Sequence, residues 1–236
     1  MPNITIHRTS GKLCLPSSGD FQRWAESRTR FGSIRPLVGE SCTMLELETI
    51  GPFSWLSSCD DAPPRVFDSP ASNKCGVYLF TVPTEEGYLI YWVGQTSQPV
   101  RTRLATHSRE FLAGTYNILD MAELREGKRT VLWRGLWWRK DAADRYEEYL
   151  LSASKVALLT LTQLRATRIY MIPTPKDRRF LARLEASIVN TLYADSKVGT
   201  ILDRGYNLAP RWDTEDPIQI RLTGPNFRGL PSILNA

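Results

Sequence analysis

Two runs of β-branched and aromatic residues, separated by one short turn, constrain the fold of this chain more than any other feature. The first run covers residues 76–82, GVYLFTV, and the second covers residues 88–94, YLIYWVG. Residues of these types favour extended strands, and the PTEEG segment between the runs has the proline and glycine of a turn. The sequence therefore predicts a β-hairpin.

Amphipathic patterns after the hairpin predict helices. One covers residues 100–113, begins after Pro99 and ends at Gly114, and another covers residues 176–194. In both, apolar residues recur every three or four positions, which gives each helix one buried face. The predicted buried residues are Val100, Leu104, Phe111 and Leu112 in the first helix and Phe180, Leu181, Leu184, Ile188 and Leu192 in the second.

The segment between these two helices carries weaker signals. They predict a helix at 118–126, a strand at 130–138, a long helix at 142–164 and a strand at 169–172. The long helix is expected to bury Leu150, Leu151, Leu158 and Leu161.

Turn-forming residues dominate the first part of the chain, where one amphipathic helix is expected at 21–28. Proline-containing loops at 59–70 separate this part from the hairpin. We therefore expect an N-terminal extension at 1–73, a core at 74–208 and a C-terminal tail at 209–236.

Composition excludes several classes of protein. Apolar residues make up 42% of the 236 residues and charged residues 23%, which excludes a disordered or collagen-like chain. No apolar segment reaches signal-peptide or membrane-helix length, so we expect a cytoplasmic protein without a membrane partner. Thirty Lys and Arg against 25 Asp and Glu leave a net charge of +5, which suits a polyanionic partner.

The cysteines do not indicate a metal site. They are widely separated, no pair has C-x-x-C spacing, and the chain has two histidines, His7 and His107. A structural zinc site is therefore not expected, and the thiols are expected to be reduced and buried. The four are Cys14, Cys42, Cys59 and Cys75.

Residue types that can carry chemistry follow one another in a particular order. G-V-Y at 76–78 begins the hairpin and W-V-G-Q-T at 92–96 ends it. R-L-x-x-H at 103–107 lies on the next predicted helix, and L-E at 184–185 lies on a later one. This order resembles the GIY-YIG nuclease family, whose two signatures are matched by the G-V-Y and W-V-G tripeptides.

The resemblance covers residues 74–208, with extra material at 115–167. It implies an α/β (α+β) fold, in which a small three-stranded antiparallel sheet is flanked by helices and carries N- and C-terminal extensions.

The resemblance also implies a role for each matched residue. Tyr78 takes the place of the tyrosine that contacts the attacking water or its base, and Arg103 that of the arginine that binds the scissile phosphate. Glu185 takes the place of the acidic ligand of the catalytic metal, Mg²⁺ with Mn²⁺ as a substitute. Asn207 takes the place of a late asparagine that orients the site, and Trp92 stands where the family has a tyrosine.

The same residues have a chemical logic of their own. Arg103 and His107 are four positions apart, so a helix places them on one face within reach of one phosphate. His107 titrates near neutrality, and it either takes the proton of the attacking water or holds the Tyr78 phenol for that task. A lone carboxylate such as that of Glu185, with water and phosphate oxygens, is an ordinary Mg²⁺ site.

Trp92 is the main departure from the family's pattern. An indole donates an N–H but has no ionisable hydroxyl. Tyr91 does not replace the missing phenol, because neighbouring strand residues point to opposite faces. Trp92 is either a donor and stacking surface in an active variant, which we expect, or a sign of lost activity.

Basic and aromatic residues interleave at 129–140, a composition suited to phosphate contacts and base stacking. Alternatively, Trp133 and Trp137 lie on one buried face of a strand. The tail at 210–228 is either an arm on DNA or a flap that closes the core. The expected DNA contacts are Arg101, Arg134, Arg139 and Lys140.

The sequence therefore predicts a magnesium-dependent endonuclease. The expected form is a type II restriction-type enzyme that cuts double-stranded DNA as a homodimer or larger homo-oligomer. Two alternatives stay open, a non-catalytic DNA-binding module on a nuclease fold and a repair or recombination nuclease for branched or damaged DNA.

Overall fold

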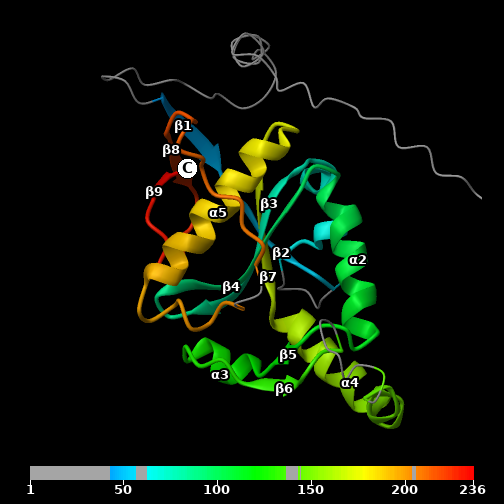
Figure 1. The fold of residues 1–236 in the computed structure, drawn as a ribbon. Coiled ribbons are helices and arrows are strands. Elements are labelled where there is room, and N and C mark those ends of the chain that lie inside the picture. Colours follow the sequence, from blue (N-terminus) through cyan, green and yellow to red (C-terminus); the bar gives the residue numbers. More distant parts are fainter. Residues whose placement is uncertain (1–42, 57–62, 137–142, 144, 204–205) are drawn as a thin grey trace, which may run out of the picture. The chain divides into compact units, whose positions relative to one another are not determined.

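The structure is a computed structural model that describes residues 43–56, 63–136, 143, 145–203 and 206–236, all of which belong to one compact unit. The unit is mixed α/β (Figure 1). Its strands are β1 (Thr43–Glu48), β2 (Ile50–Ser54), β3 (Gly76–Thr84), β4 (Gly87–Thr96), β5 (Ile118–Leu119), β6 (Val131–Trp133), β7 (Arg168–Pro173), β8 (Ile218–Thr223) and β9 (Ile233–Asn235). Its α-helices are α2 (Val100–Leu112), α3 (Met121–Arg125), α4 (Tyr146–Ala166) and α5 (Arg178–Ala194), and short 3-10 helices cover Val66–Asp68 and Pro70–Asn73.

The predicted hairpin is confirmed and forms the middle of the largest sheet. β3 and β4 pair in antiparallel fashion from Gly76 opposite Thr96 to Thr84 opposite Gly87, and β7 pairs antiparallel with the other side of β3. The strand order of this sheet is β2-β7-β3-β4. A second sheet has the order β1-β8-β9, and β5 pairs with β6.

The largest sheet has four strands, where a sheet of three was expected. The additional strand, β2, lies at the edge beside β7 and comes from the segment expected to be an extension. Gly51 and Pro52 interrupt the strand, and its register shifts between Ile50 and Phe53. Proline lacks the N–H of a ladder and is tolerated mainly at sheet edges, so this segment has the sequence of a turn although it forms a strand.

Helices α2 and α5 lie close to their predicted positions. All five residues of the predicted stripe in α5 are buried, and that helix lies across β4 and β3 (Figure 1). Asp177 begins α5, because its carboxylate accepts the backbone N–H groups of Arg179 and Phe180. In α2 the apolar stripe is buried except for Leu112, which is 57% exposed. None of the described helices is long and apolar enough to cross a membrane.

The predictions for the middle segment are partly wrong. The expected helix at 118–126 begins only at Met121, because Asp120 caps α3 and Ile118–Leu119 pairs with β6. Of the expected strand at 130–138, the structure has Val131–Trp133, and residues 137 and 138 lie outside the described part.

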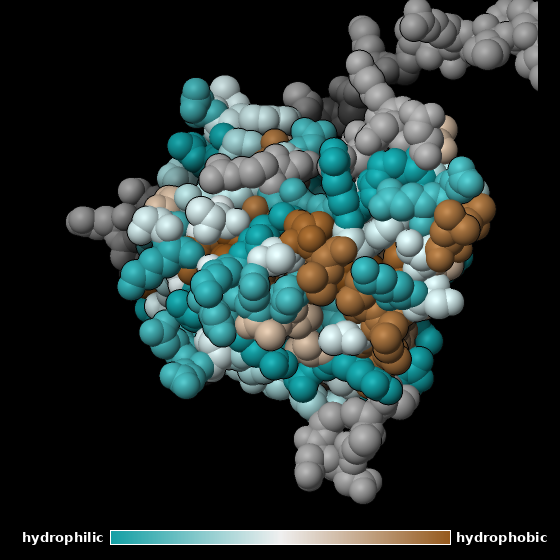
Figure 2. Space-filling model, turned by 90° about the horizontal axis from the view of Figure 1, so that it is seen from below, coloured by the Kyte–Doolittle hydropathy of each residue, from teal (hydrophilic) through white to brown (hydrophobic). Residues whose placement is uncertain are grey.

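Helix α4 presents a different face to the core than expected. Leu150, Leu151 and Leu158 are exposed, and Figure 2 shows apolar side chains gathered on the face that carries this helix. Polar side chains occupy part of the buried face instead, and the Gln163 side-chain oxygen accepts the Leu119 backbone N–H at 2.7 Å. Apolar residues lie on most sides of α4, so their spacing alone does not identify the buried side.

Cys75 is a free thiol, as expected, but it is partly exposed where burial was expected. Cys14, Cys42, Cys59 and the helix expected at 21–28 lie outside the described residues.

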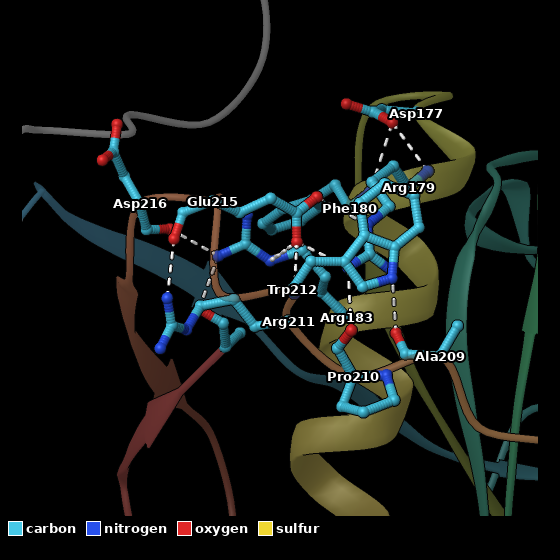
Figure 3. A network of polar contacts seen from close by, with 11 residues as sticks. Asp177, Arg179, Phe180, Arg183, Ala209, Pro210, Arg211, Trp212, Glu215 and Asp216 are labelled. Carbon is cyan, nitrogen blue, oxygen red and sulfur yellow. Dashed lines mark hydrogen bonds and ion pairs between the residues drawn. The ribbon is translucent and has the colours of Figure 1, made fainter.

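The segment after α5 folds back against that helix, and hydrogen bonds from two arginines of α5 hold it there (Figure 3). Arg179 donates hydrogen bonds from Nε and Nη2 to the two carboxylate oxygens of Glu215, at 2.6 and 2.5 Å. The Cζ atom of its guanidinium lies 4.0 Å from the centre of the Trp212 ring. Arg183 donates to the backbone carbonyls of Asp216 and Ala236. Of the two alternatives for the tail, the structure therefore shows the flap, and its buried residues include Ile218, Ile220 and Phe227.

The Arg179–Glu215 pair is expected to make stability depend on pH. The hydrogen bond from Arg179, the largest cause, lowers the pKa of Glu215 to about 2. A lowered pKa means that the carboxylate stabilises the fold above its ordinary pKa and loses this effect as the pH falls towards 2. We expect Glu215→Gln to cost about 1–3 kcal/mol of unfolding free energy at pH 7 and less at pH 3, measured by urea unfolding.

The matched control for this prediction is Glu126→Gln. Glu126 pairs with Lys128 through an exposed contact, so its loss is expected to change stability by less than about 0.5 kcal/mol at either pH. An equal loss for Glu215→Gln at pH 7 and pH 3 would contradict the assignment of the effect to the carboxylate charge.

Candidate active site

The site begins at Tyr78 and Gly94, which lie opposite each other on β3 and β4. The Tyr78 ring lies so close to Gly94 that a Cβ added there would be 2.4 Å from its Cζ and Oη atoms. Such a distance is far below a normal contact between carbon atoms. Glycine at position 94 is therefore required by the tyrosine on the neighbouring strand.

Gly94→Ala is expected to displace the Tyr78 ring and to lower the unfolding free energy by about 1–3 kcal/mol, the usual cost of overpacking. Urea unfolding of the variant measures this loss. In a Tyr78→Ala background the ring is absent, so the same substitution is expected to cost less than half as much. Equal costs in the two backgrounds would show that the ring is not what excludes a side chain at position 94.

Tyr78 and His107 form a buried pair. The Tyr78 hydroxyl is 2.7 Å from Nε2 of His107, and the two residues are 1% and 0% exposed. Burial raises the pKa of Tyr78 to about 12, although the charge and hydrogen bond of Arg103 act to lower it. Burial, and secondly the Arg103 charge, lower the pKa of His107 to about 3. At neutral pH the pair is therefore a neutral phenol and a neutral imidazole.

Arg103 and Glu185 approach this pair from two helices. Arg103 lies on α2, one turn before His107, and its side chain is exposed while its guanidinium interacts with Tyr78. Glu185 lies on α5, where its carboxylate accepts the backbone N–H of Gln95. Burial raises the pKa of Glu185 to about 7, against the opposing effect of Arg103. The site thus combines a phenol, an imidazole, a cation and a carboxyl group.

Trp92 packs against the same cluster. Its ring stacks on that of Phe80, with centres 6.2 Å apart and planes at 22°, and meets the His107 ring edge-on at 5.8 Å. The ring centre of Tyr206 lies 6.0 Å from that of the Trp92 indole. Trp92 is partly exposed, so it forms an aromatic wall of the site.

The Tyr91 hydroxyl makes its contact in a different part of the molecule. The register of β3 and β4 shifts between Phe80 and Thr81, which leaves Tyr91 as the additional residue of a β-bulge. Its buried hydroxyl is 2.6 Å from Oγ1 of Thr167. Tyr91 therefore does not bring a phenol to the cluster around Tyr78.

Two tyrosines that the sequence did not single out contact the cluster. The Tyr206 hydroxyl accepts the Val93 backbone N–H at 3.0 Å, while the neighbouring Asn207, the predicted site residue, is exposed. Tyr116, in the loop after α2, has its ring centre 5.5 Å from that of His107. No local pattern distinguishes Tyr116, whereas Tyr206 directly precedes Asn207, the asparagine that the family resemblance indicates.

Two of the four residues predicted to contact DNA lie in the described part of the chain. Arg101 on α2 and Arg134 after β6 are exposed, whereas Arg139 and Lys140 lie outside the described residues. Trp133 is buried and donates its indole N–H to a backbone carbonyl. For Trp133 the structure therefore shows the alternative of a core residue and not a stacking surface.

Glu185 is the carboxylate of this cluster that fits a metal ion. Among the described residues there is no group of three or more His, Cys, Asp or Glu side chains that would enclose an ion by itself. Mg²⁺ keeps several of its waters and is often bound by one or two carboxylates together with substrate phosphates. A half-buried carboxyl group beside Tyr78 and Arg103 meets that requirement.

Comparison of the chain with models of protein families, with curated proteins and with solved structures found no match.

Proposed function

We propose that this protein is a Mg²⁺-dependent endonuclease that hydrolyses phosphodiester bonds in double-stranded DNA. The observation that carries the proposal is the Tyr78–His107 contact of 2.7 Å, together with the interactions of Arg103 and Glu185 with Tyr78. Phosphodiester hydrolysis needs an activated water, a cation near the phosphate oxygens and stabilisation of the leaving oxygen. The four side chains supply the groups for each need.

Tyr78 and His107 act together on the attacking water in this proposal. His107 is fully buried and contacts the Tyr78 hydroxyl, which favours the role of holding the phenol over direct contact with water. The Tyr78 hydroxyl donates to Nε2 of His107, which stays neutral because burial lowers its pKa to about 3, and the phenolic oxygen accepts a hydrogen bond from the attacking water, whose proton passes to bulk water. The phosphorus–oxygen bond to the water forms as the bond to the leaving oxygen breaks.

Arg103 and Glu185 act on the phosphate. The exposed guanidinium keeps its charge at any usable pH and presents a fork of donors that matches two phosphate oxygens. Glu185 is the residue that would hold Mg²⁺, with Mn²⁺ as a substitute. When bound, such an ion acts as a Lewis acid that stabilises charge on the phosphate and the leaving oxygen.

The sheet is compatible with the GIY-YIG core that the sequence resembles. Within the four-stranded sheet, β7, β3 and β4 are adjacent and antiparallel, α2 follows the hairpin and α5 lies across β4 and β3. We include in the proposal that these elements are that core and that β2 is an addition at its edge.

We further propose a restriction-type enzyme that acts on cytoplasmic DNA. The described residues contain one such cluster of Tyr78, Arg103, His107 and Glu185, and cutting both strands with one site per chain favours a homodimer or larger assembly. Trp92 favours a second candidate, a non-catalytic DNA-binding module, because its indole has no ionisable hydroxyl. A repair or recombination nuclease is the third.

Incubation of the pure protein with linear duplex DNA and Mg²⁺ separates the three functions. Discrete bands, abolished by a chelator, are expected for the restriction-type enzyme. Cutting of branched DNA alone indicates the repair nuclease, and binding without cutting in Mg²⁺ or Mn²⁺ indicates the binding module.

A further inference from the structure

Helix α4 carries apolar side chains on the side that faces away from the core. Leu151 is 82% exposed and Leu158 is 64% exposed, whereas Val156 and Gln163, on the opposite side of the helix, are buried. Figure 1 shows α4 at the periphery of the structure, and Figure 2 shows apolar side chains gathered on the face that carries it. Contiguous exposed apolar residues usually mark a contact with another molecule.

These leucines belong to a row of residues that we call the α4 seam. Successive members are alternately four and three positions apart, which is the spacing of a coiled-coil seam. At 1.5 Å per residue the row is about 27 Å long and lies on one side of the helix. In chain order its residues are Glu147, Leu151, Ser154, Leu158, Leu161 and Arg165.

Opposite charges occupy the two ends of the seam. Glu147 and Arg165 are exposed, and neither side chain forms an ion pair with a described residue. An acid near the N-terminus and a base near the C-terminus suit the dipole of the helix itself. The same arrangement makes the seam complementary in charge to a copy of itself that runs in the opposite direction.

We propose that two copies of this protein associate through their α4 seams, packed in antiparallel orientation. One register matches every member of the seam, and the two-fold symmetry of such a dimer repeats each contact. Leucines then meet leucines or the small Ser154, and each charged end meets the opposite charge. The residues that oppose one another in the two copies are Glu147 and Arg165, Leu151 and Leu161, and Ser154 and Leu158.

The interface is small, because it consists mainly of one pair of helices. We therefore expect a dissociation constant of about 1–100 µM. Lys155 lies beside the two-fold axis, and its long exposed side chain keeps the charge in water at the rim. The proposal gives an interface to the homodimer that the proposed function favours, and the number of copies rests on that function.

Sedimentation equilibrium of the full chain without DNA tests the apolar part of the interface. Leu151→Glu is expected to raise the dissociation constant by about 100-fold or more, because a dimer loses two buried leucines. Glutamate is a good helix former, so the variant should keep its fold, which circular dichroism checks. Ile233→Glu, at an exposed apolar residue of β9, is the matched control and should leave the constant within about twofold of wild type.

A charge exchange tests the antiparallel register. Arg165→Glu puts two like-charged pairs into the dimer and is expected to raise the dissociation constant by about 5–30-fold at low salt. Adding Glu147→Arg restores opposite charges and should return the constant to within about threefold of wild type. An effect of the helix dipole alone would make this double variant the weakest of the three, since both favourable end charges are then reversed.

The outcomes separate this inference from the proposed function. A wild-type chain that stays monomeric up to about 300 µM would overturn the interface, and the seam would then be covered by another part of the chain or by a different protein. A dimer that Leu151→Glu does not weaken, or that the charge exchange does not restore, would overturn it as well. A dimer with the expected responses in a protein that cuts no DNA would support the interface while the proposed function falls.

Discussion

Glu185→Ala is expected to reduce DNA cleavage in Mg²⁺ by roughly 10³-fold or more, because a Lewis acid contributes several kcal/mol to stabilising the transition state. Binding of duplex DNA should stay within a few-fold of wild type, since the exposed cations that contact phosphates are unchanged. Single-turnover cleavage and equilibrium DNA binding, measured on the same preparation, check the two parts separately.

Glu148→Ala is the control for this prediction. Glu148 lies on α4, pairs with Arg145 and is exposed, so the substitution removes the same side chain from a position away from the cluster. Partial rescue of Glu185→Ala by Mn²⁺ would support the role of the carboxylate as a metal ligand. Cleavage by Glu185→Ala at the wild-type rate in Mg²⁺ would refute that assignment.

Tyr78→Phe is expected to slow cleavage by about 10²–10⁴-fold, the effect typical of a positioned acid–base group. The ring remains in its place against Gly94, so the change is confined to the hydroxyl that contacts His107. Because Nε2 of His107 then loses a buried partner, a loss of about 1–3 kcal/mol of stability accompanies the loss of rate. The rate is measured well below the melting temperature of the variant.

Tyr91→Phe separates the chemical effect from the structural one. Tyr91 is also a buried tyrosine on the same hairpin, and its hydroxyl contacts Thr167, away from Tyr78. The variant should lose a similar amount of stability but keep its cleavage rate. If Tyr78→Phe also cuts at the wild-type rate, the phenol has no chemical role and the resemblance of the motifs is coincidental.

Local patterns were sufficient to predict the hairpin and α5. Continuous runs of β-branched and aromatic residues predicted the strands, and apolar residues at three- and four-residue spacing predicted the helices, so each pattern is visible within one segment. The four-residue spacing of Arg103 and His107 placed both on one helical face for the same reason. Glu185 came from the family resemblance, and the structure brings its carboxyl group to Tyr78 and Arg103.

Features that depend on distant parts of the chain were missed. The edge strand β2 contains Gly51 and Pro52, which locally indicate a turn, and pairing with β7 overrides that preference. Which face of α4 is exposed depends on how α2 and β5 pack against the helix. Tyr116 enters the site only because the loop after α2 folds back onto His107 and Trp92, and no sequence period encodes such a contact.

The contacts that hold α5 in place come from residues that the ribosome adds late. Tyr78, Arg103 and His107 leave the ribosome early, whereas Arg183, two residues before Glu185, is held by the backbone at 216 and 236. Ser187 likewise donates to the Asn235 carbonyl at 2.6 Å. A nascent chain that has not yet reached β9 therefore lacks the contacts that fix the Glu185 helix. On the proposed function, the helix that carries Glu185 gains its last contacts only after residues 235 and 236 have been made.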